Sequence, residues 1–299
     1  MNSSKLKYLT AMFIYGTVAI FSHYILLSAT GIVLSRAVLG VVVILIYALL
    51  IKRQKIDFEK IKKNLLWLIL AGVSLGLNWV CLFTSYEYTT VAIATLLNYL
   101  APVIMILLSP LILKEHLTLK RVICVLVAFL GMFLIIDPTG ISGGINKIGL
   151  LLGMGSATAY VGIIVFNKLM KEIDPYSKTV VILLVAAFVI LPFAILNTDF
   201  SLIIIDYKLI ILLLVIGIIH TGIAYILYFG SMPNLESQTI SILSYIEPVV
   251  SIILSVIILK EEMSYLTLIG AFLILGATLL SELRIKKIHK SSNQNSIFL

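Results

Sequence analysis

Charged residues are scarce in this chain: Asp, Glu, Lys and Arg make up 12% of its 299 residues. A soluble globular domain carries about 25%. Hydrophobic residues reach 61% of the chain, and the mean hydropathy is +1.15. So little polar surface cannot face water. The composition therefore excludes a soluble globular protein and predicts an integral membrane protein.

Groups that carry chemistry are equally few. The two cysteines, Cys81 and Cys124, lie in apolar runs and are interpreted as packing residues. The four histidines are scattered, without the spacing of metal ligands or of a nucleophile and its base. No Gly-rich phosphate-binding motif occurs, so ATP drive by this chain is not expected. We predict no catalytic residue, metal or cofactor, and a membrane enzyme is the weakest alternative.

Apolar runs recur along the whole chain. A hydrocarbon core of about 30 Å needs about 20 helical residues, and polar or turn-forming clusters separate the runs. The sequence predicts an all-α integral membrane fold with ten transmembrane helices, at residues 8–27, 31–51, 64–86, 90–113, 120–136, 147–168, 178–196, 208–230, 237–259 and 265–283.

The basic residues predict the orientation of these helices. If both termini lie in the cytoplasm, all but four of the 22 Lys and Arg residues fall on the cytoplasmic side. The exceptions are Arg36, Lys147, Lys208 and Lys260. Positive charge favours the cytoplasmic side, so we predict a multi-pass protein of the cell membrane. The net charge of +8 then indicates topology and lipid contact, not a nucleic-acid partner.

An internal repeat relates the two halves. Residues 95–115 match residues 241–261 at an offset of 146, and the matches include Tyr99 with Tyr245 and Pro102 with Pro248. The offset spans five predicted helices, an odd number, so the second copy enters the membrane inverted. Inverted repeats are typical of carriers that work by alternating access. We predict five-helix repeats at 8–136 and 147–283, followed by a basic, disordered cytoplasmic tail at 284–299.

These features resemble the drug/metabolite transporter superfamily, in the form with two EamA domains. The resemblance is carried by the stretch from Pro102 to Glu115, its echo from Pro248 to Glu261, Gly-Ser-Ala-Thr-Ala-Tyr at 155–160 and Thr-Gly-Ile-Ala-Tyr at 221–225. It implies ten helices, cytoplasmic termini, and transport of amino acids, other metabolites or drugs through a central cavity. The repeats differ in one respect, because Ala101 stands where the second copy has Glu247.

Glu247 is the first candidate for a functional role. It lies near the middle of a predicted span, where a carboxylate costs about 2.5–3.5 kcal/mol on insertion scales. It should therefore face a cavity or a partner. One interpretation is a proton-coupling or cation-contacting site, and the other is a structural acid beside a proline kink.

Pro102 and Pro248 are interpreted as kinks that shape or gate the cavity. Each proline removes one helical hydrogen bond and frees the carbonyl four residues earlier, which belongs to Asn98 and Ser244 respectively. Broken helices at membrane depth are tolerated where they line a cavity. The alternative is a static bend.

The remaining candidates are polar or amphipathic residues inside predicted spans. His220 is either a proton shuttle or a packing residue. Arg36 either snorkels to the interface, pairs with an acid such as Glu87, or attracts an anionic substrate. The expected cavity walls are flat and amphipathic, and the candidates for them are Asn78, Trp79, Asn98, Tyr99, Tyr160, Tyr225, Tyr228 and Tyr245.

Together these observations predict a secondary carrier for small metabolites. The expected substrates are amino acids or similar amphiphilic compounds, or drugs, and protons are the candidate coupling ion. The partners are thus a small-molecule substrate and the lipid bilayer. The alternative function is a lipid-handling, receptor or scaffold protein of the membrane. A carrier needs a polar pocket closed to lipid, whereas a lipid scramblase needs a groove along its side.

Overall fold

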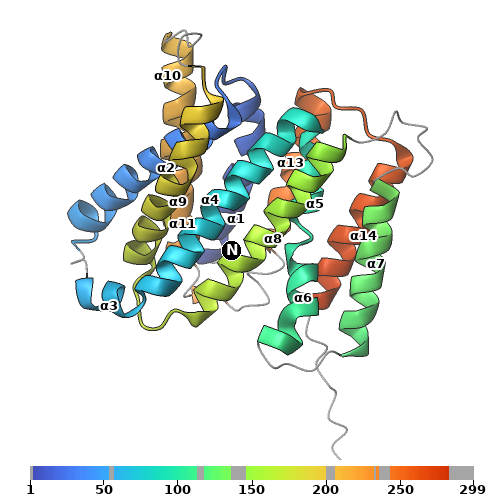
Figure 1. The fold of residues 1–299 in the computed structure, drawn as a ribbon, viewed down its shortest axis with the longest axis horizontal. Helices are drawn as coiled ribbons and strands as arrows, with labels where there is room; N and C mark the ends of the chain where they lie inside the picture. Colours follow the sequence, from blue (N-terminus) through green and yellow to red (C-terminus); the bar gives the residue numbers. More distant parts are fainter. Residues whose placement is uncertain are drawn as a thin grey trace, which may run out of the picture.

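The computed structural model describes residues 3–53, 57–112, 118–135, 146–199, 206–231, 234–235 and 243–282, which form a bundle of helices (Figure 1). The longer regular elements in these ranges are α1 (Ser3–His23), α2 (Ala29–Ile46), η1 (Tyr47–Ile51), α3 (Phe58–Lys63), α4 (Leu65–Tyr88), α5 (Val91–Asn98), α6 (Ala101–Ile112), α7 (Leu119–Ile135), α8 (Lys147–Leu169), α9 (Pro175–Asn197), α10 (Tyr207–Leu214), η3 (Val215–Ile223), α11 (Ala224–Ser231), α13 (Ile246–Ile258) and α14 (Tyr265–Glu282). The elements η1 and η3 are π-helical and continue α2 and α10.

Six helical segments of the described chain are long and apolar enough to cross a membrane. They are Ala29–Ile51, Leu65–Tyr88, Val91–Leu108, Lys147–Leu169, Pro175–Asn197 and Tyr207–Ser231. Three shorter apolar helices are Val122–Ile135, Ile246–Ile258 and Tyr265–Leu280. The fold is all-helical in the described ranges, as predicted, whereas the count of ten spans stays a prediction.

Two helix bounds differ from those predicted, and local capping explains both. The first helix ends at His23 instead of residue 27, because Ser28 begins the next helix by accepting a 3.1 Å hydrogen bond from the Gly31 amide. Residues 58–63 were expected in a polar connection but form α3. Asp57 caps this helix by accepting from the Lys60 amide at 3.0 Å.

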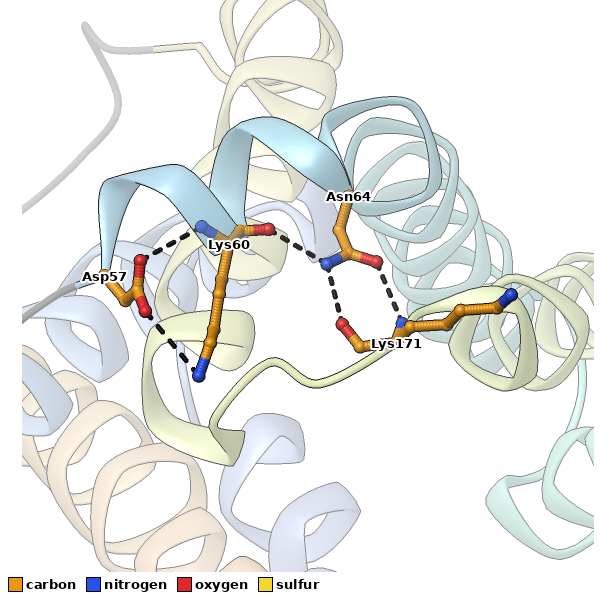
Figure 2. Close-up of polar contacts among 4 residues, drawn as sticks. All are labelled: Asp57, Lys60, Asn64 and Lys171. Atoms are coloured by element: carbon orange, nitrogen blue, oxygen red, sulfur yellow. Dashed lines mark hydrogen bonds and ion pairs between the residues drawn. The ribbon is translucent and has the colours of Figure 1, made fainter.

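Asn64 fixes one end of the bundle (Figure 2). Its Nδ2 donates to the carbonyls of Lys60 and Lys171, each at 2.9 Å, and its Oδ1 accepts from the Lys171 amide at 2.9 Å. The junction of α3 and α4 is thus tied to the connection between α8 and α9. Nearby, the Lys60 amide holds the pKa of Asp57 below its usual value, and Lys60 Nζ lies 3.6 Å from the same carboxylate. We call this part of the molecule the α3 end.

Side-chain contacts between helix termini close the opposite end, which we call the Glu87 end. The Glu87 carboxylate, at the end of α4, accepts from the amide of Ala29 at the start of α2 (3.1 Å). The Ser28 and Thr198 hydroxyls lie 2.5 Å apart and join the start of α2 to the end of α9.

The carboxylate of Glu261 makes a third contact at the Glu87 end. One oxygen accepts from the Val91 amide at 2.7 Å, and the other accepts from the Ala92 amide at 3.2 Å. These are the first amides of α5, and they have no partner within the helix. A helix start also favours negative charge. Glu261 therefore ties the segment after α13 to the start of α5.

One contact between helices occurs twice, with the two halves in exchanged roles. The contact of α4 with α9 is matched by the contact of η3 with α2. A Cβ on Gly76 would lie 3.0 Å from the Cβ of Val189, and one on Gly222 would lie 2.6 Å from the Cβ of Val43. Both the two glycines and the two valines are 146 positions apart. The same small-residue packing is therefore used twice, because a larger side chain would separate either pair of helices.

Two apolar cores and an outer helix pair surround the centre of the bundle. One core is built mainly from α2, α4 and α9, and the other mainly from α5 to α8 with α14. The helices α7 and α14 pack on each other at one edge (Figure 1).

The helices that carry the repeated prolines are interrupted at matching positions. The first is broken between α5 and α6 at Tyr99 and Leu100, just ahead of Pro102. In the second half, Tyr245 precedes α13 with φ −72° and ψ −8°, close to the φ −74° and ψ 4° of Tyr99. Each proline lacks the amide that would bond the carbonyl four residues earlier, at Asn98 or Ser244, and its ring clashes with that carbonyl. The two breaks place Tyr99 and Tyr245 at equivalent positions.

Candidate functional site

A cavity of about 820 Å³ lies between the helices of the two halves. Its lining comes from α1, α2, α4, α5, α6, α8, α9, α11 and α13, together with Tyr99, Leu235, Ser244 and Tyr245. The volume falls in the range of small-molecule sites, about 300–1,000 Å³. No residue of α7 or α14 lines it.

The structure brings most of the sequence-predicted candidates to this cavity. Those that line it are Arg36, Asn78, Trp79, Asn98, Tyr99, Pro102, Tyr160, Tyr225, Tyr228, Tyr245 and Glu247. They are far apart in the sequence and come from both halves. What any of them binds stays a prediction.

Arg36 is buried at the wall of the cavity, with 4% of its surface exposed. Its Cζ lies 4.1 Å from the centre of the Trp79 ring and 5.3 Å from that of Phe83. Its Nε donates to Thr221 Oγ1 at 3.2 Å. Thr221 in turn donates to the Ile216 carbonyl of η3, so the guanidinium is held by a fixed hydroxyl.

Two of the alternatives for Arg36 do not hold. With 4% exposure its side chain does not snorkel to an interface. The expected pair with Glu87 is also absent, because the Glu87 carboxylate instead accepts from the Ala29 amide. In the described part of the chain, the ion pair is that of Asp57 and Lys60, and Arg36 has none.

Glu247 lies in the first turn of α13 and lines the same cavity. The side chain of Tyr99, from the other half, hydrogen-bonds to its carboxylate. The start of a helix also stabilises a negative charge. Arg36 is within electrostatic range of this carboxylate, without forming an ion pair. One anion and one cation thus share the centre of the bundle.

Asn78 and Asn98 belong to a buried polar cluster beside the first helix break. Asn78 Nδ2 donates to Asn98 Oδ1 at 2.9 Å and to the Ser156 carbonyl at 2.8 Å. Ser156 Oγ also donates to Asn98 Oδ1, at 3.1 Å. All three residues are buried. The cluster joins α4, α5 and α8.

Aromatic rings form much of the cavity wall. The rings of Tyr99 and Tyr245, the repeat-related pair, lie 6.4 Å apart between centroids. Tyr15 of α1 packs edge-on against Tyr225 at 5.7 Å and Tyr228 at 6.1 Å. The Tyr15 hydroxyl is buried and has no hydrogen-bond partner among the described residues. Such a wall is apolar and flat, with hydroxyl groups at intervals.

Sequence analysis missed several polar lining residues. They are Tyr15, Tyr86, Thr95, Asn167, Lys178, Thr179 and Ser251. Thr95 and Ser251 face each other across the halves, with 3.4 Å between their hydroxyls. Ser244 also lines the cavity, and the repeat marks it as the mate of Asn98. Lys178 carries a signal as the only charged residue of α9, but it was interpreted as a topology signal.

Two of the candidates lie outside the cavity lining. His220 is 2% exposed, its Nε2 lies 2.9 Å from Thr17 Oγ1, and its ring packs on Phe21 with centroids 4.8 Å apart. These contacts join η3 to α1. Pro248 is buried in α13 behind Glu247. The structure therefore does not place either side chain where a solute in this cavity would touch it.

The cavity lining extends toward both ends of the bundle. Toward the α3 end it reaches Asn167 near the end of α8, Lys178 in the first turns of α9 and Phe229 near the end of α11. Toward the Glu87 end it reaches Tyr86 near the end of α4 and Thr95 of α5, next to the contacts of Glu87 and Glu261.

The described residues contain no group of three or more His, Cys, Asp or Glu side chains that could hold a metal ion. The polar groups of the cavity are instead amides, hydroxyls and a few separated charges. Such groups suit the binding of a small organic molecule. The fold defines a class, that of multi-pass membrane proteins with two related halves and a cavity between them.

Comparison with known proteins places the chain within that class. The model of the EamA-like transporter family matches twice, at residues 4–137 and 147–283, and the chain belongs to this family. It is therefore a multi-pass membrane transporter.

Named relatives agree with this family. An uncharacterized transporter, YxxF, of Bacillus subtilis (strain 168) is 29% identical over 262 residues, covering 86% of this chain and 82% of the relative. An uncharacterized transporter of Archaeoglobus fulgidus is 27% identical over 189 residues, covering 63% of this chain and 66% of the relative. A solved crystal structure shares the fold, with a TM-score of 0.64 at 20% identity over 94% of this chain and 98% of the other.

Proposed function

We propose that this transporter is a secondary carrier that moves small metabolites across the cell membrane by alternating access between two inverted halves. The observation that carries the proposal is the meeting of the two broken helices at one cavity. Tyr99 and Tyr245, related by the repeat, contact each other there. Residues related by a two-fold axis touch only near that axis, so the cavity lies where two exchanging halves would share it.

The basic residues support an orientation for this exchange. With both termini in the cytoplasm, as the basic residues favour, the α3 end is cytoplasmic and the Glu87 end faces outward. Exchange of conformations between the halves would open the cavity to each end in turn.

The proposed substrates are amino acids or similar amphiphilic compounds, because the cavity combines aromatic walls with separated charges. Glu247 is the proposed site of proton coupling. It is the carboxylate of the cavity lining, and Tyr99 hydrogen-bonds to it from the other half. A proton on Glu247 would change that contact, and therefore the relation between the halves.

The test begins with a substrate. Purified protein is screened by thermal shift against amino acids, organic cations, organic acids and nucleotide sugars, because binding to the native state raises apparent stability. Solutes that bind are then tested for uptake into proteoliposomes with an imposed pH gradient. Glu247→Gln is expected to lose pH-driven uptake and to retain exchange of labelled for unlabelled solute at equal pH. Glu59→Gln, a change of an exposed acid in α3, is the matched control.

Each result bears on one part of the proposal. If Glu247→Gln keeps the full response to the pH gradient, the proton role of Glu247 is wrong. If no bound solute crosses the bilayer with the wild-type protein, the carrier proposal is wrong.

A further inference from the structure

Arg36 is a buried cation without an anionic partner. It is 4% exposed, and it makes no ion pair with a described residue. A buried charge is costly unless it is paired and hydrogen-bonded. The faces of Trp79 and Phe83 offset part of this cost, but aromatic faces do not accept the in-plane hydrogen bonds that a guanidinium donates.

The donors of Arg36 are mostly unused. A guanidinium has five N–H groups, and among the described residues only Thr221 accepts one, from Nε. The two terminal nitrogens of Arg36 have no hydrogen-bond partner among the described residues, yet neither is fully buried. Both therefore reach open space, and the space beside Arg36 is the cavity. The fork of the guanidinium matches a carboxylate in geometry.

Tyr15 supplies a second and independent observation. Its hydroxyl is buried and unpartnered, which is rare in proteins. It lines the same cavity, and it lies within electrostatic range of Arg36. An acceptor atom bound at the guanidinium could also take the hydrogen of this hydroxyl after a small shift of the ring.

The remaining charges of the cavity indicate the net charge of the solute. Lys178 lines the cavity and has an aromatic neighbour, Phe229, at 5.9 Å. Glu247 already receives a hydrogen bond from Tyr99 and lies at a helix start. The protein thus already stabilises the negative charge of Glu247, whereas it supplies no anionic partner for the positive charge of Arg36. Among the described lining residues two cations face one anion.

We propose that, among the amphiphilic solutes of the proposed function, the cavity favours organic anions over zwitterionic amino acids, with the carboxylate of the solute held by Arg36 and Tyr15 and its flat apolar body against the wall formed by Trp79 and Tyr225. This inference rests on the proposed function only in taking the cavity as the substrate site. It assigns Arg36 and Tyr15 as the residues that recognise charge. Thr221 is a positioning residue, because it holds the Nε of Arg36.

Binding can be measured without transport. The chain has two tryptophans, and Trp67→Phe leaves Trp79, beside Arg36, as the single tryptophan, which can be excited selectively over tyrosine. Quenching of Trp79 fluorescence is titrated with three probes: 4-nitrobenzoate is an anion, 4-nitrobenzamide is neutral, and 4-nitrophenylalanine is a zwitterion. The wild-type cavity in this background is expected to bind the benzoate at least about tenfold more tightly than the amide, a difference of about 1.4 kcal/mol.

Variants in the same background test the two residues. Arg36→Gln is expected to remove the preference for benzoate over amide while amide binding persists, which also shows that the cavity is folded. Tyr15→Phe should weaken benzoate binding by about threefold, as for one lost hydrogen bond, and leave the amide unchanged. Tyr24→Phe, at a side chain that is 45% exposed, is the matched control. If Arg36→Gln does not fold, Arg36→Lys still removes the planar fork and should reduce the preference.

The outcomes separate this inference from the proposed carrier. Equal binding of benzoate and amide by the wild-type cavity, or an unchanged preference in both Arg36 variants, would overturn the anion site. Tighter binding of 4-nitrophenylalanine than of the benzoate would assign the cavity to zwitterions instead. If the benzoate binds as expected but no solute crosses the bilayer, the site stands and the carrier fails. If another solute is transported and the benzoate does not bind, the carrier proposal stands and the anion site is wrong.

Discussion

At the first helix break, Asn98 lies in a buried cluster with Asn78 and Ser156, whereas at the second break Ser244 is half-buried beside the Tyr8 hydroxyl at 2.7 Å. The residue two positions beyond each tyrosine differs as well. It is Ala101 in the first copy and Glu247 in the second. The two breaks share their backbone and their proline, yet their side chains make different contacts.

Two identical repeats would give both breaks the same role, whereas this difference in side chains gives the two breaks different roles. A buried hydrogen-bonded network between helices favours one arrangement of those helices. A charged residue at the cavity instead responds to solutes and protons. We therefore expect the first break to act as an anchor between α4, α5 and α8, and the second break to change during the transport cycle. The following variants test that division.

Asn78→Ala should have the largest effect on stability. It removes both hydrogen bonds that Asn78 Nδ2 donates to other helices. A hydrogen bond between membrane helices contributes about 0.6 kcal/mol on average and up to about 1.7 kcal/mol. Because two such bonds are lost and truncation of a buried side chain leaves a cavity, the free energy of unfolding should fall by about 2 kcal/mol. Titration with SDS in mixed micelles, followed by circular dichroism, measures this change.

The matched control for Asn78 is another asparagine at the same cavity. Asn167 Nδ2 donates to the Ile163 carbonyl within its own helix, α8, at 2.8 Å. Asn167→Ala should therefore cost less than about 0.5 kcal/mol, since the carbonyl keeps its helical bond and no helices are joined. Equal losses in the two variants would show that the cluster is no anchor.

Glu261→Ala tests the tie between the two broken helices, and we expect an intermediate effect. The carboxylate holds the first amides of α5 from the segment that follows α13. Loss of a helix cap costs about 0.5–2 kcal/mol, so we expect about 1 kcal/mol. Hydrogen exchange should also become faster at Val91 and Ala92.

The neighbouring acid provides the control for this prediction. Glu262 is exposed, so Glu262→Ala removes the same charge from the same segment without removing a cap. It should leave both the free energy of unfolding and the exchange of the α5 amides unchanged. Similar effects of the two variants would mean that general electrostatics act at this end, not the capping contact.

The breaks themselves are the part of the site that the sequence carries most directly. Tyr99 and Tyr245 stand at the same place in two copies, three residues ahead of a proline. Such a repeat can be detected in a single chain, because chance does not match tyrosines and prolines in register. The family follows from the same residues, and the match of its model at 4–137 and 147–283 shows it.

The rotation of each helix about its axis could not be predicted in the same way. Tyr15, on α1, has no mate in the matched stretches, so nothing in the sequence marks it as lining the cavity. In η3 the backbone is π-helical, and the Thr221 hydroxyl donates to the carbonyl five residues earlier, at Ile216. His220 was a candidate because of its residue type and its depth in the span, and nothing in the sequence indicates that Thr221 contacts Arg36.

Tyr8→Phe should have the smallest effect of the three stability variants. It removes the hydroxyl that lies 2.7 Å from Ser244 Oγ and keeps the ring that packs on Tyr228, 5.4 Å away. One hydrogen bond between membrane helices is lost, so we expect about 0.6 kcal/mol in the same SDS titration. Tyr207→Phe, at a side chain that is 79% exposed, should change nothing. A loss in Tyr8→Phe as large as that in Asn78→Ala would reverse the comparison, because the second break would then be held as firmly as the first, and the moving element would have to be sought outside both.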